Sequence, residues 1–286
     1  MIDLRGNGGG HLTEATALSG LFIDNGPVVQ LRNGNGRISR LDDPDPVARV
    51  AYSGPLAVLV DRYSASASEI FAAAIQDYER GVIIGQQTFG KGTVQNLYSL
   101  DQYLRSEDGK GYGQLTLTIG KYYRVTGEST QHRGVDPDIK LPSHINAEVI
   151  GESVRDSALP WDTVPTTRFR AGKPLDSAIE SLAVSYEERA KDDPNFKFQL
   201  DQIRAAEAMS AQKSVSLNIE TRRKEREEEL ERRLARFNER REALGMEAID
   251  SLDAIEDDEL PDILLDQAAG IITDLATMRQ VDYLEP

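Results

Sequence analysis

Two short segments of the sequence carry side chains that could together perform nucleophilic chemistry. Residues 64–69 read Ser-Ala-Ser-Ala-Ser-Glu, and residues 88–92 read Thr-Phe-Gly-Lys-Gly. A serine hydroxyl becomes a nucleophile when a nearby base removes its proton, and a neutral lysine amine can be that base. The two segments therefore predict a serine nucleophile with Lys91 as its base, provided that the fold brings them together.

Ser66 has two interpretations. Followed three residues later by Glu69, it fits the capping box, in which both side chains satisfy backbone N–H groups at the start of a helix. The same helix N-terminus, placed after a buried strand, favours developing negative charge. Ser66 could then attack a carbonyl carbon while the amide of Ala67 stabilises the oxyanion.

Lys91 lies between two glycines and close to Phe89 and Val94. Apolar surroundings disfavour the charged form of a lysine. A neutral lysine could take the serine proton and later return it to the leaving amine. Gln95 could orient the lysine amine, and Thr88 could form a hydrogen bond nearby. The alternative interpretation of Lys91 is a surface lysine on a loop.

A glycine loop follows the strand expected at residues 2–4. Residues 6–10 read Gly-Asn-Gly-Gly-Gly and expose several bare backbone amides. One of these amides could be the second oxyanion donor. The alternative interpretation is a flexible turn, since glycine adopts turn conformations freely.

Composition limits the classes of protein. The chain has 286 residues, enough for about two domains, and its net charge of −15 argues against a general nucleic-acid binder. The absence of cysteine excludes disulfides and thiolate nucleophiles, and three histidines argue against a histidine-rich metal centre.

No apolar run reaches the roughly 18 residues of a membrane span. The opening residues, 1–5, read like the interior of a domain and not like a signal peptide, so we expect a truncated chain.

The serine run is expected to lie between two buried strands. Residues 56–60 are uninterruptedly apolar, which is typical of a strand buried on both faces of a parallel sheet. Residues 64–78 have a helical apolar face, and residues 82–84 are again strand-like. This order predicts a βαβ unit. Further strands are expected at residues 27–32, 36–39, 94–98, 115–119 and 121–125.

Composition changes near Pro142, and helices are expected beyond it. Residues 221–245 contain nine basic and seven acidic residues, a pattern that favours a solvated, salt-bridged helix. Asp262 is placed to cap a last amphipathic helix. The expected helices cover residues 175–190, 196–211 and 217–244 and the segment after Asp262.

Four motifs, in this order and at this spacing, resemble those of carboxyl-terminal processing peptidases (family S41), most closely the tail-specific subgroup. They are residues 3–10, 64–69, 88–92 and 133–139. The resemblance implies that the middle serine, Ser66, is the nucleophile and that Lys91, 25 positions later, is the base. It adds Gln95 and Asp77 to the catalytic set. The implied oxyanion donors are Ala67 and either Gly9 or Gly10.

The resemblance also implies a fold. We expect part of an α/β core of the crotonase/ClpP-like kind over residues 1–145. An α-helical C-terminal domain of tail-specific type is expected over residues 146–286. Family members carry a PDZ domain before the first motif, which helps capture substrates and activate the site. Its absence here predicts that this chain by itself could be inactive.

The implied activity is that of a serine endopeptidase that works through an acyl-enzyme, with no cofactor and no metal. Its substrates would be proteins with apolar C-terminal tails, delivered in some cases by a lipoprotein adaptor. The resemblance implies a periplasmic location in a Gram-negative bacterium, with possible membrane association and no nucleic-acid partner.

Three rival hypotheses remain. Residues 85–91 match a phosphate-binding loop up to its lysine, but that motif needs a helix next, and residues 94–98 read as a strand. A Ser–His–Asp hydrolase would need His11 or His132 close to Ser66. A catalytically inactive fragment or paralogue could instead act as a scaffold, with the charged helix as a partner surface.

Overall fold

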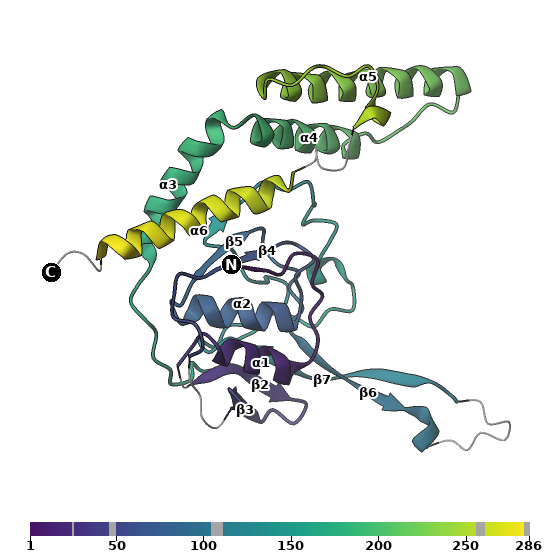
Figure 1. Ribbon diagram of the computed structural model, residues 1–286. Helices are drawn as coiled ribbons and strands as arrows, with labels where there is room; N and C mark the ends of the chain where they lie inside the picture. Colours follow the sequence, from purple (N-terminus) through teal and green to yellow (C-terminus); the bar gives the residue numbers. More distant parts are fainter. Residues whose placement is uncertain (25, 46–49, 104–110, 256–260, 283–286) are drawn as a thin grey trace. The chain divides into compact units, whose positions relative to one another are not determined.

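The structure is a computed structural model that describes residues 1–24, 26–45, 50–103, 111–255 and 261–282. The chain divides into two compact units, both visible in Figure 1. The α/β unit comprises residues 1–140 and 146–177, and the helical unit comprises residues 141–145 and 178–286. The α/β chain with a helical C-terminal region agrees with the predicted fold class.

The first sheet of the α/β unit is parallel and has the strand order β1-β4-β5-β8. Its strands are β1 (Ile2–Asp3), β4 (Ala57–Val60), β5 (Val82–Gly85) and β8 (Ile139–Lys140). Every residue of β4 is buried, which agrees with the apolar run in the sequence. The predicted βαβ unit is therefore confirmed as β4–α2–β5.

The second sheet is antiparallel and has the order β3-β2-β7-β6. Its strands are β2 (Pro27–Asn33), β3 (Ile38–Asp42), β6 (Thr93–Ser99) and β7 (Gln114–Tyr123). The predicted β2–β3 hairpin is confirmed, whereas the two strands expected over residues 115–125 form the single strand β7. The β6–β7 hairpin extends from the body of the unit as a long arm (Figure 1).

Helix α2 (Ala67–Asp77) contacts β5 of the first sheet, β2 of the second sheet and α1 (Leu12–Gly20). Its buried face includes Phe71, whose ring meets the ring of Phe22 edge to face at 5.9 Å. Burying this helix on several sides fixes the direction of its axis and therefore the place of its N-terminus.

The predicted helix start at Ser64 is wrong by three residues. The Ala65 N–H donates to the carbonyl of Asn7 at 3.0 Å, and the Ser64 hydroxyl donates to the carbonyl of Leu4 at 2.7 Å. These bonds connect the segment to the glycine loop after β1, so it cannot adopt helical geometry. The helix begins only after Ser66.

The helical unit contains the predicted helices, each close to its expected range. They are α3 (Asp176–Asp192), α4 (Pro194–Ser210), α5 (Ile219–Ala243) and α6 (Ile263–Asp282). Asp262 Oδ1 accepts the Leu265 N–H at 3.1 Å, so the predicted cap of α6 is confirmed. Helix α5 carries i,i+3 and i,i+4 ion pairs such as Arg222–Glu225, as its charge pattern predicts. Among the described residues, no helix combines the length and apolarity that a membrane crossing needs.

The compact units divide the chain differently from the boundary expected at residue 145. Residues 146–177 belong to the α/β unit. We call residues 146–167 the strap; this segment contains turns and the 3₁₀ helix η2 (Glu152–Val154) and is hydrogen-bonded to the rest of the α/β unit. The Val164 N–H donates to the carbonyl of Gly127 and the Thr167 N–H to that of Val125, at 2.8 and 2.9 Å.

Candidate active site

Ser66 lies between β4 and α2 as the N-cap residue of the helix. Its backbone angles, φ 58° and ψ −113°, are ones that residues with a side chain rarely adopt. Such strain costs on the order of 1–3 kcal/mol and persists only where the surroundings enforce it. The strained turn marks Ser66 as a functional candidate.

The other two serines of the run are used in structural hydrogen bonds. The Ser64 hydroxyl donates to the carbonyl of Leu4 at 2.7 Å, and the Ser68 hydroxyl donates to that of Asn7 at 3.0 Å. Both bonds attach the serine run to the chain that follows β1. Of the three hydroxyls, that of Ser66 is therefore the best candidate for chemistry.

Glu69 joins the serine segment to the lysine segment. Its Oε2 accepts the backbone N–H groups of Ser66 at 2.7 Å and Lys91 at 3.0 Å. Its Oε1 accepts the Thr88 hydroxyl at 2.6 Å and the Gly90 N–H at 2.7 Å. The capping-box pattern pointed to the first of these bonds only. The sequence contains no signal for the other three.

The environment of Glu69 favours two opposite protonation states. Complete burial raises the pKa of the carboxyl to about 7, although the hydrogen bonds from Thr88, Gly90, Ser66 and Lys91 work in the opposite direction. A carboxylate accepts hydrogen bonds only, and all four neighbours donate. The observed geometry therefore matches the ionised form, which dominates above about pH 7.

Lys91 is brought to the same place as Gln95, as predicted. The Lys91 side-chain nitrogen lies 3.2 Å from Gln95 Oε1, within donating distance. Lys91 is half-buried and Gln95 is exposed, so the surroundings of the amine are less apolar than the sequence suggested.

The buried hydroxyl of Tyr122 is within hydrogen-bonding distance of two carbonyls, those of Lys91 and of Ser66, the latter at 3.1 Å. Nothing in the sequence indicated this role for Tyr122.

The glycine loop lies directly against Ser66. A Cβ atom on Gly9, whose φ is +92°, would lie 2.7 Å from the amide nitrogen of Ala67 and 2.9 Å from the Cβ of Ser66. Only glycine allows this approach. The Gly9 N–H itself donates to Asn7 Oδ1 at 2.9 Å, whereas a Cβ on Gly10 would meet nothing within 4 Å. The structure thus places the loop beside Ala67, as the expected oxyanion site requires.

Asp77 is not brought to the other candidates. It is the last residue of α2, ten positions beyond Ala67, and the helical rise puts it about 15 Å away along the axis. Its buried carboxylate accepts hydrogen bonds from Arg124 Nε at 3.1 and 3.2 Å. Burial raises the pKa of Asp77, and Arg124 opposes that rise. The geometry therefore gives Asp77 an ion-pairing place in the unit, away from Ser66.

The two histidines of the rival triad are engaged elsewhere or exposed. His132 Nε2 lies 2.7 Å from the carbonyl oxygen of Leu159, and His11 is an exposed residue at the N-cap of α1. The residues that the structure describes include no cluster of three or more acidic, histidine or cysteine side chains that could hold a metal ion. The positions of the two histidines do not support the Ser–His–Asp hypothesis.

The phosphate-loop hypothesis is wrong. That motif needs a helix directly after its lysine, so that the helix N-terminus can hold the phosphates. Here the strand β6 (Thr93–Ser99) follows Lys91 and pairs with β7.

Comparison with known proteins places this chain in a family. The model of peptidase family S41 matches residues 1–141, and that of the C-terminal domain of tail specific protease (DUF3340) matches residues 145–277. The tail-specific protease of Haemophilus influenzae is 45% identical over 278 residues, which cover 96% of this chain and 40% of that protein. The carboxy-terminal-processing protease of Bartonella bacilliformis is 38% identical over 155 residues, 54% of this chain and 33% of the relative.

A solved structure, the photosystem II D1 C-terminal processing protease, is 31% identical with a TM-score of 0.40, over 52% of this chain and 36% of that one. The chain spans less than half the length of these relatives. From the two family matches and the Haemophilus relative, we conclude that this chain belongs to peptidase family S41 and carries the C-terminal domain of the tail-specific proteases.

Proposed function

We propose that the protein is a serine endopeptidase in which Ser66 is the nucleophile and Lys91 is the general base. One observation carries the proposal. The buried carboxylate of Glu69 accepts hydrogen bonds from the backbone amides of both residues, at 2.7 and 3.0 Å. A shared acceptor of this kind holds two segments 25 positions apart in one fixed arrangement, which is what a nucleophile–base pair requires.

In the proposed reaction, neutral Lys91 removes the proton of the Ser66 hydroxyl as its oxygen attacks the scissile carbonyl carbon. The Ala67 N–H and an amide of the glycine loop stabilise the oxyanion. Because the Gly9 N–H already donates to Asn7, we assign the second donor to Gly10. The lysine ammonium then protonates the leaving amine as the C–N bond breaks. Water, activated by the same lysine, hydrolyses the acyl-enzyme and restores the Ser66 hydroxyl.

The proposed substrates are proteins recognised at apolar C-terminal tails. The support is the name of the Haemophilus relative, a tail-specific protease, which matches nearly the whole of this chain. With it we propose a periplasmic location in a Gram-negative bacterium, membrane association, and delivery of some substrates by a lipoprotein adaptor.

The test follows degradation of an unfolded protein with an apolar C-terminal tail by the intact protein, from pH 6 to 10. The same substrate with an acidic tail is the matched control. We expect cleavage that depends on the apolar tail and is abolished in Ser66→Ala and Lys91→Ala variants that remain folded. Lys91→Arg should also be inactive, because arginine stays charged. Wild-type rates in Lys91→Ala would refute the dyad, and an inert intact protein would favour the scaffold hypothesis.

A further inference from the structure

The strap reaches the segment that carries Lys91 through a buried arginine. The Arg62 side chain is almost fully buried, and its Nε donates to the carbonyl of Ile150 at 2.6 Å. Its Nη1 donates to the carbonyl of Thr88, three residues before Lys91. The Glu152 N–H donates to the carbonyl of Phe89 at 3.0 Å. The strap is thus bonded directly to Phe89 and is linked to Thr88 through Arg62.

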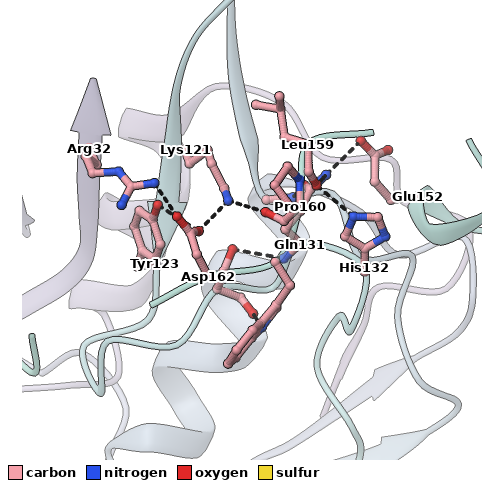
Figure 2. Close-up of polar contacts among 12 residues, drawn as sticks. Arg32, Lys121, Tyr123, Gln131, His132, Glu152, Leu159, Pro160 and Asp162 are labelled. Atoms are coloured by element: carbon pink, nitrogen blue, oxygen red, sulfur yellow. Dashed lines mark hydrogen bonds and ion pairs between the residues drawn. The ribbon is translucent and has the colours of Figure 1, made fainter. Parts of the chain in front are cut away.

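A second connection runs through Gln131, which is fully buried. Its Oε1 accepts the N–H of Gly92, the residue after Lys91, at 2.8 Å. Its Nε2 donates to two strap groups, the Leu159 carbonyl at 2.9 Å and Glu152 Oε1 at 3.3 Å (Figure 2). One amide group therefore links the strap to the backbone beside the proposed base.

Both glycines beside Lys91 are packed against the segment that contains Gln131. A Cβ on Gly90, whose φ is +92°, would lie 2.8 Å from the carbonyl carbon of His132. A Cβ on Gly92 would lie 2.7 Å from the Gln131 nitrogen. The His132 N–H also donates to the carbonyl of Gly90 at 2.8 Å. A shift of residues 131–132 must therefore move the backbone on either side of Lys91.

The strap end of this connection is firmly held. The Trp161 Nε1–H donates to the carbonyl of Ser129 at 2.9 Å, and the guanidinium carbon of Arg133 lies 3.7 Å from the centre of the Trp161 ring. Asp162 forms ion pairs with Arg32 and Lys121 (Figure 2). These contacts fix the strap carbonyl that Gln131 binds.

We propose that Gln131 is a positioning residue for Lys91, and that the strap acts through it to place the base of the peptidase site. The strap lies within residues 145–277, which match the tail-specific C-terminal domain. That domain would then contribute a segment to catalysis and not only to substrate handling. The inference rests on the proposed function, since it concerns the same nucleophile and base.

The primary test is Gln131→Leu in the intact protein, with kcat and KM measured on the apolar-tailed substrate. The change keeps the approximate volume but removes the bond to Gly92 and both bonds to the strap. A misplacement of about 1 Å can cost about 10²-fold in rate. We expect kcat to fall at least about tenfold, with KM within about twofold, because the substrate-binding groups are untouched.

Two further variants separate positioning from loss of stability. Thr166→Val removes another bond of the strap, which the Thr166 hydroxyl donates to the carbonyl of Thr126 at 2.7 Å. Along the strap, Thr166 comes after Glu152 and Leu159, the two residues that Gln131 binds. The Thr166→Val change should leave kcat unchanged. Gln131→Glu keeps the acceptor for Gly92 but turns a carboxylate oxygen towards Glu152 and the Leu159 carbonyl. A second change, Glu152→Gln, supplies a donor for the first of these contacts, so it should restore part of the lost kcat.

The outcomes distinguish the two proposals. If the wild type cleaves, Ser66→Ala is inactive, and Gln131→Leu keeps wild-type kcat, the positioning role is refuted and the dyad stands. A fall in kcat equal to that of Thr166→Val, or a fall that tracks only the loss of thermal stability, also refutes it. If the wild type itself does not cleave, the proposed function is refuted, and the positioning role that rests on it is refuted with it.

Discussion

The most informative single change is Glu69→Gln, because Glu69 connects Ser66 to Lys91. Removing the side chain with Glu69→Ala would leave four donors without this acceptor, two of them on half-buried residues, at up to about 1–3 kcal/mol each. That loss approaches the whole stability of a domain, about 5–15 kcal/mol. The glutamine variant is milder. Its amide oxygen can still accept from Ser66 and Lys91, and the Thr88 hydroxyl can rotate to accept from the amide nitrogen.

In the glutamine variant only the Gly90 N–H faces a donor, so the free energy of unfolding should fall by about 1–3 kcal/mol. The loss of a buried charge has the opposite effect on stability. The pKa of Glu69 is raised from its ordinary 4.5 to about 7, so the folded state binds the proton more tightly than the unfolded state does. Stability from this group is therefore greatest below about pH 4.5 and falls as pH rises through about 7, by about 3 kcal/mol in total. Glutamine avoids that cost at pH 8, so we expect the variant to fold.

Activity should respond more strongly than stability. Displacement of Gly90 moves the neighbouring Lys91, and we expect kcat at pH 8 to fall by about 10- to 100-fold. The ratio of wild-type to variant kcat should be large above pH 7. It should shrink towards about 1 below pH 6, because protonated Glu69 resembles glutamine.

The assay measures kcat of both proteins on the apolar-tailed substrate between pH 5.5 and 9, with thermal unfolding recorded at each pH. A ratio that is constant with pH would refute the assignment of the titration to Glu69. Equal activity of the two proteins at pH 8 would refute its positioning role altogether.

Three other predictions use the same assays. Gly9→Ala should lose nearly all activity and at least about 1 kcal/mol of stability, because φ is +92° and the new Cβ would lie 2.6 Å from a backbone oxygen. A variant with the wild-type kcat would contradict this close approach of the glycine loop to Ser66. Tyr122→Phe should lower kcat and cost about 1–3 kcal/mol of stability. Burial raises the pKa of Tyr122 well above its usual value, so the ratio of the variant's kcat to the wild-type kcat should stay constant from pH 6 to 9. Asp77→Asn removes the charge that faces Arg124 but keeps an amide oxygen as acceptor, and Arg124 still donates to Gln76, so it should cost about 1–3 kcal/mol. The kcat per folded molecule should be unchanged, and a lower kcat would reinstate Asp77 in the catalytic set.

Local patterns in the sequence were sufficient for most of the fold. The apolar run at 56–60 and the amphipathic helix after it predict a βαβ unit because each signal depends on neighbouring residues only. The sequence also predicts Ser66 and Lys91, through residue types and spacing, and Gln95 beside the lysine, whereas the exposure of Gln95 comes from the structure. It misplaces the start of α2, because the bonds to Leu4 and Asn7 override the helical preference of Ser64 and Ala65.

What only the tertiary structure decided is how these parts are held. Glu69 looks like an ordinary capping residue in the sequence, since the donors at Thr88, Gly90 and Lys91 lie about 20 positions away. The roles of Tyr122 and Gln131 likewise depend on partners from distant segments. Asp77, placed in the site by motif spacing, lies at the far end of a rigid helix. The spacing of residues along the chain predicts local geometry. The hydrogen bonds that Glu69 and Gln131 accept from distant backbone groups form only when the sheets and the strap pack together.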